Sequence, residues 1–168
     1  MTPTILALDL SLTCTGVCRD GQCSRISTKL RGWPRLERIV SDITDAAVGC
    51  DVGVIEGYSF GSKGRSVFQI AELGGIVRWE LLDRGLLIVD VPPSSLKRYA
   101  TGRGNAGKDE MIAAAIRRFG FEGSSNDEAD AYLLWHMALH AYGSPVVDVP
   151  KAQAEAVGKV EWPWAVLA

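Results

Sequence analysis

The sequence predicts an α/β domain whose mixed sheet has three antiparallel strands followed by two parallel ones, with helices on its faces. The length of 168 residues and the hydrophobic content of 47% suit one domain with a real core. Short apolar runs alternate along the chain with segments of helical periodicity. Their order is three strands, a helix, a strand, a helix, a strand and further helices, which is typical of a mixed five-stranded sheet.

The strands are predicted from short apolar runs that end at turn residues. They occupy residues 5–10, 15–19, 22–27, 52–58 and 86–91. The pair Asp20-Gly21 is typical of a tight hairpin turn, so the second and third strands are expected to be antiparallel neighbours. The fourth strand is expected to be covered on both faces, and Pro92-Pro93 ends the fifth.

Four helices are predicted from apolar residues at helical spacing. They run from Pro34 to Gly49, over residues 66–83, after the loop at residues 101–107, and over residues 126–142. Phe68 in the second helix is expected to lie in the core, and Ile112, Ile116 and Phe119 are expected to form the buried face of the third. Residues 1–143 are therefore assigned to the domain, and the proline-punctuated residues 144–168 to a tail of unknown role.

The composition argues against several classes of protein. No targeting segment opens the chain and no run approaches the roughly 18 apolar residues of a membrane span, so a soluble, cytoplasmic protein without a membrane partner is expected. The cysteines at positions 14, 18, 23 and 50 lack Cys-x-x-Cys spacing, which favours reduced thiols over a zinc site. The net charge is −2, but residues 60–118 carry ten basic and six acidic residues. This asymmetry suits a basic approach to an acidic centre.

Two carboxylates interrupt apolar runs that are predicted to be buried strands. Asp9 stands in the run ILALDL, and Glu56 stands in the run VGVIEG. A buried charge is costly unless something compensates it, and Gly57 would let a ligand or another backbone approach closely. The alternative is that each acid lies in water at a frayed strand end, which explains one such acid better than two.

A second acidic pair opens the last helix. Asp127 and Asp130 are three residues apart, so they share a helix face, and that face continues through the apolar Leu134 and Met137. The alternative is that Asp127 stabilises the positive N-terminus of the helix. This alternative explains Asp127 well and Asp130 poorly.

Carboxylates gathered in a dry cleft repel one another unless cations lie between them. Hard oxygen ligands favour Mg²⁺, for which Mn²⁺ is expected to substitute. Three or four of the acids Asp9, Glu56, Asp127 and Asp130 are therefore expected to bind such ions and to be catalytic. The corresponding chemistry is phosphodiester hydrolysis, in which one ion activates water and another stabilises the departing 3′ oxygen. His136 and His140 lie about 100° away from the two aspartates on the same helix, so neither is expected to be a ligand.

These residues resemble the RuvC-like Holliday junction resolvases, in particular the divergent branch found in bacteriophages, over about residues 4–142. The resemblance is carried by Leu8-Asp9-Leu10-Ser11, Thr15-Gly16-Val17, Val54-Ile55-Glu56 and Asp127-Glu128-Ala129-Asp130-Ala131. It implies a ribonuclease H-like fold and metal binding by the four acids. It also implies a Mg²⁺-dependent endodeoxyribonuclease that makes paired nicks in four-way junctions and other branched DNA, without a nucleotide cofactor.

The resemblance further implies DNA contacts near the cleaved phosphate. Lys97 and Lys108 match basic positions of this kind, and Lys108 is expected to be catalytic as well because it can offset the charge that develops there. Arg103, in the glycine-bearing loop before Lys108, is a further candidate. The alternative for each lysine is a solvated charge.

The resemblance places a homodimer interface on the helix at residues 66–83, which suits a junction in which two strands are cut symmetrically. The loop before this helix is expected to insert an aromatic side chain at the branch point, which would be Phe60 or Phe68. Lys63 and Arg65 would then bind phosphates.

Two other classes of function stay open. Residues 9–16 also resemble the phosphate-binding hairpin of actin-like ATPases and sugar kinases, although 168 residues are too few for the two domains that those proteins pair. A second alternative is a catalytically inactive module that keeps the fold and binds branched DNA. A nuclease acting on other branched or RNA-containing duplexes is a third alternative.

Overall fold

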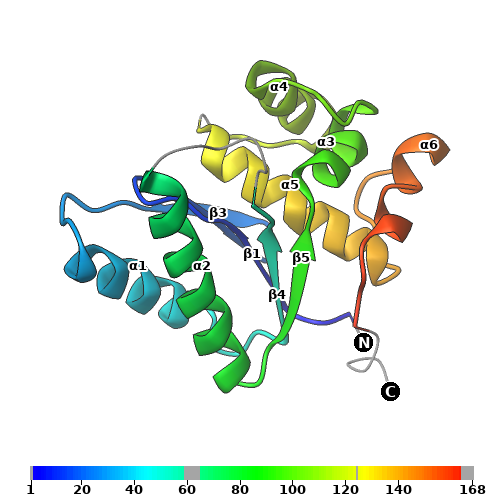
Figure 1. The fold of residues 1–168 in the computed structure, drawn as a ribbon. Coiled ribbons are helices and arrows are strands. Elements are labelled where there is room, and N and C mark those ends of the chain that lie inside the picture. Colours follow the sequence, from blue (N-terminus) through cyan, green and yellow to red (C-terminus); the bar gives the residue numbers. More distant parts are fainter. Residues whose placement is uncertain (1, 59–64, 124, 164–168) are drawn as a thin grey trace.

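A five-stranded mixed sheet forms the centre of the fold in the computed structural model, which describes residues 2–58, 65–123 and 125–163, without the side chains of residues 65 and 66. The strands are β1 (Ile5–Asp9), β2 (Thr15–Arg19), β3 (Gln22–Ile26), β4 (Val52–Glu56) and β5 (Leu87–Val91). Their order across the sheet is β3-β2-β1-β4-β5 (Figure 1). β1, β2 and β3 are antiparallel neighbours, and β4 lies parallel to both β1 and β5. The predicted sheet is therefore confirmed.

The hairpin between β2 and β3 is closed by the predicted pair of turn residues. Asp20 and Gly21 have φ angles of 51° and 78°. Two successive positive φ angles are the signature of a type I′ turn, whose twist matches that of the two strands. The turn pairs Arg19 with Gln22 and Cys18 with Cys23.

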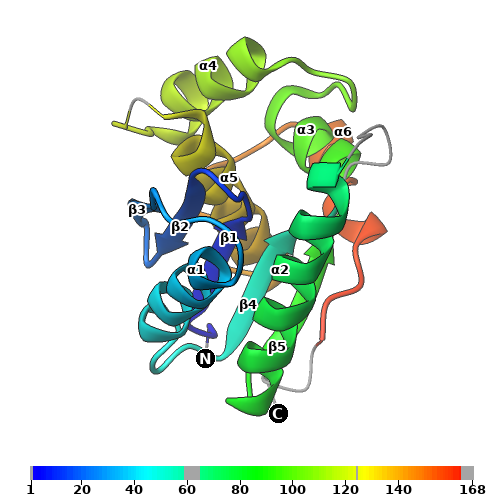
Figure 2. The ribbon, with the colours of Figure 1, turned by 60° about the vertical axis from the view of Figure 1, so that its left-hand side comes forward.

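Helices cover both faces of the sheet. They are α1 (Trp33–Ala46), α2 (Arg65–Asp83), α3 (Pro93–Thr101), α4 (Lys108–Phe119), α5 (Asn126–Ala141) and the short α6 (Lys151–Ala154), followed by a 3₁₀ turn at Val157–Lys159. α1 and α2 pack side by side on one face, whereas α5 crosses the other face and carries α3 and α4 on its outer side (Figures 1 and 2). In the described residues, no helix is both long and apolar enough to cross a membrane.

Covering both faces explains why the central strands β1 and β4 are apolar without alternation. In β1, Leu6 and Leu8 belong to the core beneath α1 and α2, whereas Ile5 and Ala7 belong to the core beneath α5. Successive side chains of a strand point to opposite faces, so a strand buried on both sides needs an unbroken apolar run. Asp9 ends that run at the edge of the sheet.

Two predicted core residues are exposed. Phe68 is 73% exposed, because the buried side of α2 is formed by other residues, namely Leu73, Val77 and Leu81. Phe68 lies about 140° around the helix from Leu73, so its predicted core role is wrong. Ile116 is 49% exposed, because α4 buries Met111, Ala115 and Phe119 instead.

α3 was not among the predicted helices. It has nine residues, and Pro93 occupies its first turn, where the missing N–H costs nothing. Leu96, Tyr99 and Ala100 are buried against α4 and α5, so tertiary packing stabilises a helix too short to show a clear period. The residues that follow the predicted boundary at 143 also pack on this side of the molecule, where Trp162 is buried and donates a hydrogen bond of 2.9 Å to the Val157 carbonyl.

Candidate metal centre

Three carboxylates from distant parts of the chain meet at one edge of the sheet. Asp9 and Glu56 are the last residues of the parallel neighbours β1 and β4, so their side chains leave the sheet at the same edge. Asp130 reaches this edge from the second turn of α5. One oxygen atom from each of the three side chains lies within 4.8 Å of the other two. The structure therefore brings together three of the four acids that the sequence selected.

Gly16 allows α5 to come close enough for this meeting. It pairs with Asp9 across β1 and β2. A Cβ atom at Gly16 would overlap the backbone carbonyl group of Asp127 in the first turn of α5. A side chain at this position would therefore push the helix, and Asp130 with it, away from the end of β1.

The partly buried carboxyl groups of the cluster raise one another's pKa, which disfavours ionisation of all of them together. Burial, followed by the charges of Glu56 and Asp130, raises the pKa of Asp9 to about 9. Burial, followed by repulsion from Glu56 and Asp127, raises the pKa of Asp130 to about 7. Divalent cations are the usual means of compensating such a group of charges.

One atom of the cluster indicates directly where a cation would bind. In the described part of the chain, the buried Oδ1 of Asp130 has no hydrogen-bond partner. Buried carboxylate oxygens are normally satisfied. Three carboxylates that each place an oxygen atom within 4.8 Å of the others match the hard oxygen ligands that Mg²⁺ and Mn²⁺ prefer, so the residues fit such an ion.

Asp127 lies beside the cluster but outside the set of mutually close oxygens. Its charge raises the pKa of both Asp9 and Asp130, so it is within electrostatic reach of them. It also stands in the first turn of α5, where an acid stabilises the positive helix end. Its predicted role as a fourth ligand stays a prediction, and the helix-capping alternative is compatible with its position.

Two lysines bring positive charge to the cluster. Lys97 of α3 lines a hollow of about 280 Å³ together with Asp9 and Glu56. Lys108 is the first residue of α4. The charges of Lys97 and Lys108 oppose the effect of burial on the pKa of Glu56, so both act on the carboxylates. Their predicted contacts with DNA stay predictions, and the exposed position of Lys108 is compatible with the alternative of a solvated charge.

Tyr58 is a residue of this site that the sequence did not single out. It lines the same hollow, and its hydroxyl group donates a hydrogen bond of 3.2 Å to the Ala71 carbonyl of α2. The guanidinium carbon of Arg78 lies 5.1 Å from the centre of its ring, and Arg78 is also bound to Asp90 of β5. The only signal in the sequence was its position two residues after Glu56.

The remaining predicted DNA contacts are less clearly placed. Arg103 forms an ion pair of 2.8 Å with Glu110, so its charge is already partnered. Phe60 and Lys63 lie outside the described residues, and so does the side chain of Arg65. Phe68, by contrast, is exposed on α2.

Comparison with known proteins gives a consistent set of relatives, although no protein-family model matches the chain. The crossover junction endodeoxyribonuclease RuvC of Synechococcus sp. (strain WH7803) is 31% identical over 107 residues, which are 60% of this chain and 69% of that protein. RuvC of Anaeromyxobacter sp. (strain K) is 30% identical over 100 residues, 58% of this chain and 54% of that one. The chain thus spans about half the length of the latter relative.

A solved structure agrees with these relatives. RuvC of Thermus thermophilus in complex with a Holliday junction substrate superimposes with a TM-score of 0.69, covering 87% of this chain and 99% of that chain at 16% identity. The likeness of the two folds confirms the predicted ribonuclease H-like architecture.

Proposed function

Because the chain belongs to the RuvC family of crossover junction endodeoxyribonucleases, we propose that it cuts four-way junctions and related branched DNA by metal-dependent hydrolysis of phosphodiester bonds. The observation that carries this proposal is the meeting of Asp9, Glu56 and Asp130 at one sheet edge. No side-chain nucleophile is needed for this chemistry. Mg²⁺ is the proposed ion, and Mn²⁺ is proposed to substitute for it.

The residues of the site divide the work of the reaction between them. Asp9, Glu56 and Asp130 would hold the ions and orient the phosphate that they bind. Bound divalent ions supply Lewis acidity, which makes a water molecule nucleophilic and stabilises the departing oxygen. Lys97 and Lys108 would offset the negative charge that the phosphate brings to an acidic site. The rigid strands β1 and β4 keep two of the carboxylates in place.

We also propose that the protein acts as a homodimer through α2. The exposed residues of this helix include Phe68, Trp79 and Leu82, together with the small Ala71 and Gly75. They follow one another at helical spacing and form an apolar stripe, which supports an interface with a second copy. Two sites related by a twofold axis would cut two strands symmetrically. The solution mass of the wild type, compared with that of Trp79→Glu, tests this part.

A cleavage assay tests the activity itself. The protein is incubated with a synthetic four-way junction, a flap and a linear duplex, with and without Mg²⁺. Paired nicks in the junction that require the metal are expected. Cleavage that survives chelation would overturn the metal mechanism, binding without cleavage would favour an inactive module, and ATP turnover without nicking would favour the kinase-like alternative.

The four cysteines are free, which supports a further proposal that the protein works in the reducing cytoplasm.

A further inference from the structure

A continuous groove runs from the metal centre to the first turn of α1. It consists of three adjoining hollows with volumes of about 280, 430 and 190 Å³, the first of which contains Asp9 and Glu56. Neighbouring hollows share their walls, which are Leu10, Val67 and Ile70 between the first two, and Leu12, Arg35 and Gln69 between the last two. The groove begins in the hollow that Lys97 of α3 also lines, and it then leaves the cluster on the side of α1 and α2, whereas Lys108 belongs to α4.

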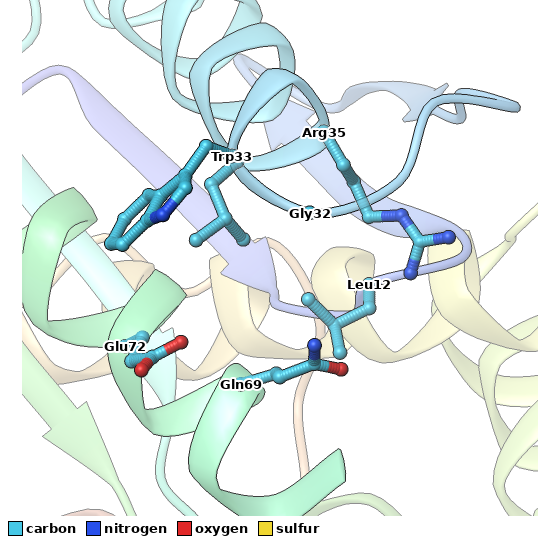
Figure 3. A pocket seen from close by; sticks show the side chains of 7 residues that line it. Leu12, Gly32, Trp33, Arg35, Gln69 and Glu72 are labelled. Atoms are coloured by element: carbon cyan, nitrogen blue, oxygen red, sulfur yellow. The ribbon is translucent and has the colours of Figure 1, made fainter.

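The far end of the groove has an aromatic wall and a cationic wall. Figure 3 shows Trp33 on α1 opposite Glu72 on α2, whereas the guanidinium group of Arg35 lies at the other end of this hollow, near Leu12. The Trp33 side chain is 69% exposed. An exposed indole at the edge of a groove is a platform on which any nucleic acid base can stack.

The segment that carries these two residues is strongly basic. Residues 25–38 contain five basic residues and one acidic residue in a chain of net charge −2. Arg25 and Arg38 are paired with carboxylates. Among the described residues, Lys29, Arg31 and Arg35 have no carboxylate within 4.0 Å, and Arg35 Nε donates a hydrogen bond of 2.7 Å to the Leu30 carbonyl, which holds the side chain in place.

The topology of the sheet places this segment at the catalytic edge. β3 runs parallel to β1 because each is antiparallel to β2, so both strands end at the same edge. Asp9 pairs with Gly16, and Gly16 pairs with Arg25, so the basic segment begins in the same row of the sheet as the first metal-binding acid.

We propose that this groove binds an unpaired DNA strand leaving the metal centre, with Arg35 on a backbone phosphate and Trp33 stacked on a base. The inference rests on the proposed nuclease function and adds a second path for the strand, which starts in the hollow lined by Lys97 and continues toward α1 instead of toward Lys108. Positive charge without partners matches the phosphates, and the apolar walls and the indole match the bases. Glu72 limits the phosphate path to the Arg35 end, because it would repel a phosphate beside Trp33.

The test measures binding separately from cleavage. Affinity for a four-way junction is measured by fluorescence anisotropy with Ca²⁺ in place of Mg²⁺, for the wild type, Trp33→Ala, Trp33→Phe, Arg35→Gln and Arg35→Lys. Trp33→Ala is expected to weaken binding about tenfold, with Trp33→Phe retaining most of the affinity. Arg35→Gln is expected to lower the slope of log K against log salt by about one, and Arg35→Lys to restore it. Arg38→Gln is the matched control on the same helix, because Asp42 already neutralises that residue.

A scan of the DNA locates the contact. Abasic sites are placed one at a time on both sides of the cleaved phosphate, as mapped from the nicks. The wild type is expected to lose affinity at one position on one side, and Trp33→Ala is expected to be insensitive there. Thermal unfolding confirms that each variant is folded, and a failure of Trp33→Ala to fold leaves the scan of the wild type and Trp33→Phe as the deciding comparison.

Several outcomes overturn the groove without touching the nuclease proposal. Wild-type cleavage together with unchanged binding by Trp33→Ala and Arg35→Gln would do so, as would an abasic scan without a sensitive position. A Trp33→Ala variant that binds DNA as the wild type does but loses dimer mass would assign this surface to a second copy of the chain instead. If the wild type neither binds nor cuts the junction, the proposed function itself fails.

Discussion

Helix α5 carries two buried titratable regions with opposite characters. Asp130, near its start, faces two other carboxylates, whereas His136, further along, is enclosed by the rings of Phe119, Tyr132 and Trp135. Burial raises the pKa of Asp130 to about 7 and lowers the pKa of His136 to about 4. In both places burial disfavours the charged form.

The two regions differ in what would remove the energetic cost of burying their titratable groups. The histidine avoids the cost of a buried charge by staying neutral among aromatic rings, although its buried Nε2, like the Oδ1 of Asp130, has no hydrogen-bond partner among the described residues. The carboxylates repel one another even after burial has been accounted for, and an oxygen of Asp130 lacks a partner within the described residues. Carboxylates that repel one another indicate a site for a cation, whereas a neutral ring that is shifted by burial alone indicates packing.

The largest expected effect is on catalysis. Asp130→Asn and Glu56→Gln are each expected to lower junction cleavage at saturating Mg²⁺ by roughly 10³-fold, because each removes a metal-binding charge. Binding of the junction is expected to persist or tighten, since repulsion between the acid and the phosphates falls. Glu128→Gln is the control on the same helix, because Glu128 pairs with Arg25 instead of joining the cluster. A cleavage rate that barely changes in Asp130→Asn would refute the assignment of the carboxylate cluster as a metal site.

A substitution outside the carboxylate cluster tests how closely the first turn of α5 must pack against β2. Gly16→Ala places a methyl group against the backbone of Asp127, so the first turn of the helix must shift. The expected cost is about 2–3 kcal/mol in the free energy of unfolding, measured by urea denaturation, together with a loss of metal affinity measured by calorimetry. Gly53→Ala is a useful control, because its Cβ would meet only flexible ends of apolar side chains at 3.1–3.2 Å. Equal metal affinity in both variants would count against the role assigned to Gly16.

The acidic region is expected to destabilise the metal-free protein at alkaline pH. The pKa of Asp9 is raised to about 9 in the folded state, so its stabilising effect is complete below about pH 4 and is lost as the pH rises toward 9. At pH 8 with EDTA, Asp9→Asn is expected to have a free energy of unfolding about 2 kcal/mol higher than the wild type. This difference corresponds to a Tm that is higher by roughly 4–8 °C. Mg²⁺ is expected to raise the Tm of the wild type and to have little effect on Asp9→Asn. A lower Tm for the variant in EDTA would show that the acids are already compensated.

The aromatic region is expected to respond to pH in the opposite sense. The folded-state pKa of His136 is lowered to about 4, so the stability that depends on its neutral form is present above about pH 6.5 and is lost as the pH falls toward 4. Between pH 7 and pH 5 the loss is about 2 kcal/mol. His136→Phe keeps a ring in this place and is expected to flatten that part of the stability curve. If the variant loses as much stability between pH 7 and pH 5 as the wild type does, groups other than His136 control this pH dependence.

The sequence predicted the strands better than the helices. Strands buried on both faces, such as β1 and β4, are apolar runs, and the Asp20-Gly21 turn marks the hairpin of β2 and the more exposed β3, so all five strands were recognisable locally. The helices required knowledge of which side each one buries. α3 was missed because its nine residues are stabilised by packing on α4 and α5, and Phe68 was placed in the core although α2 turns it to the outside.

By itself, the sequence determined the order of strands and helices and the presence of acids where apolar runs end, because periodicity and an unexpected charge are local properties. Only the tertiary structure decided that Asp9, Glu56 and Asp130 come within 4.8 Å of one another, with Asp127 beside them. It also decided that α3 turns Lys97 toward the acids and that Trp33 and Arg35 line a groove leading away from them. These relations depend on the packing of elements that lie far apart along the chain, and no local pattern of residues encodes such distances.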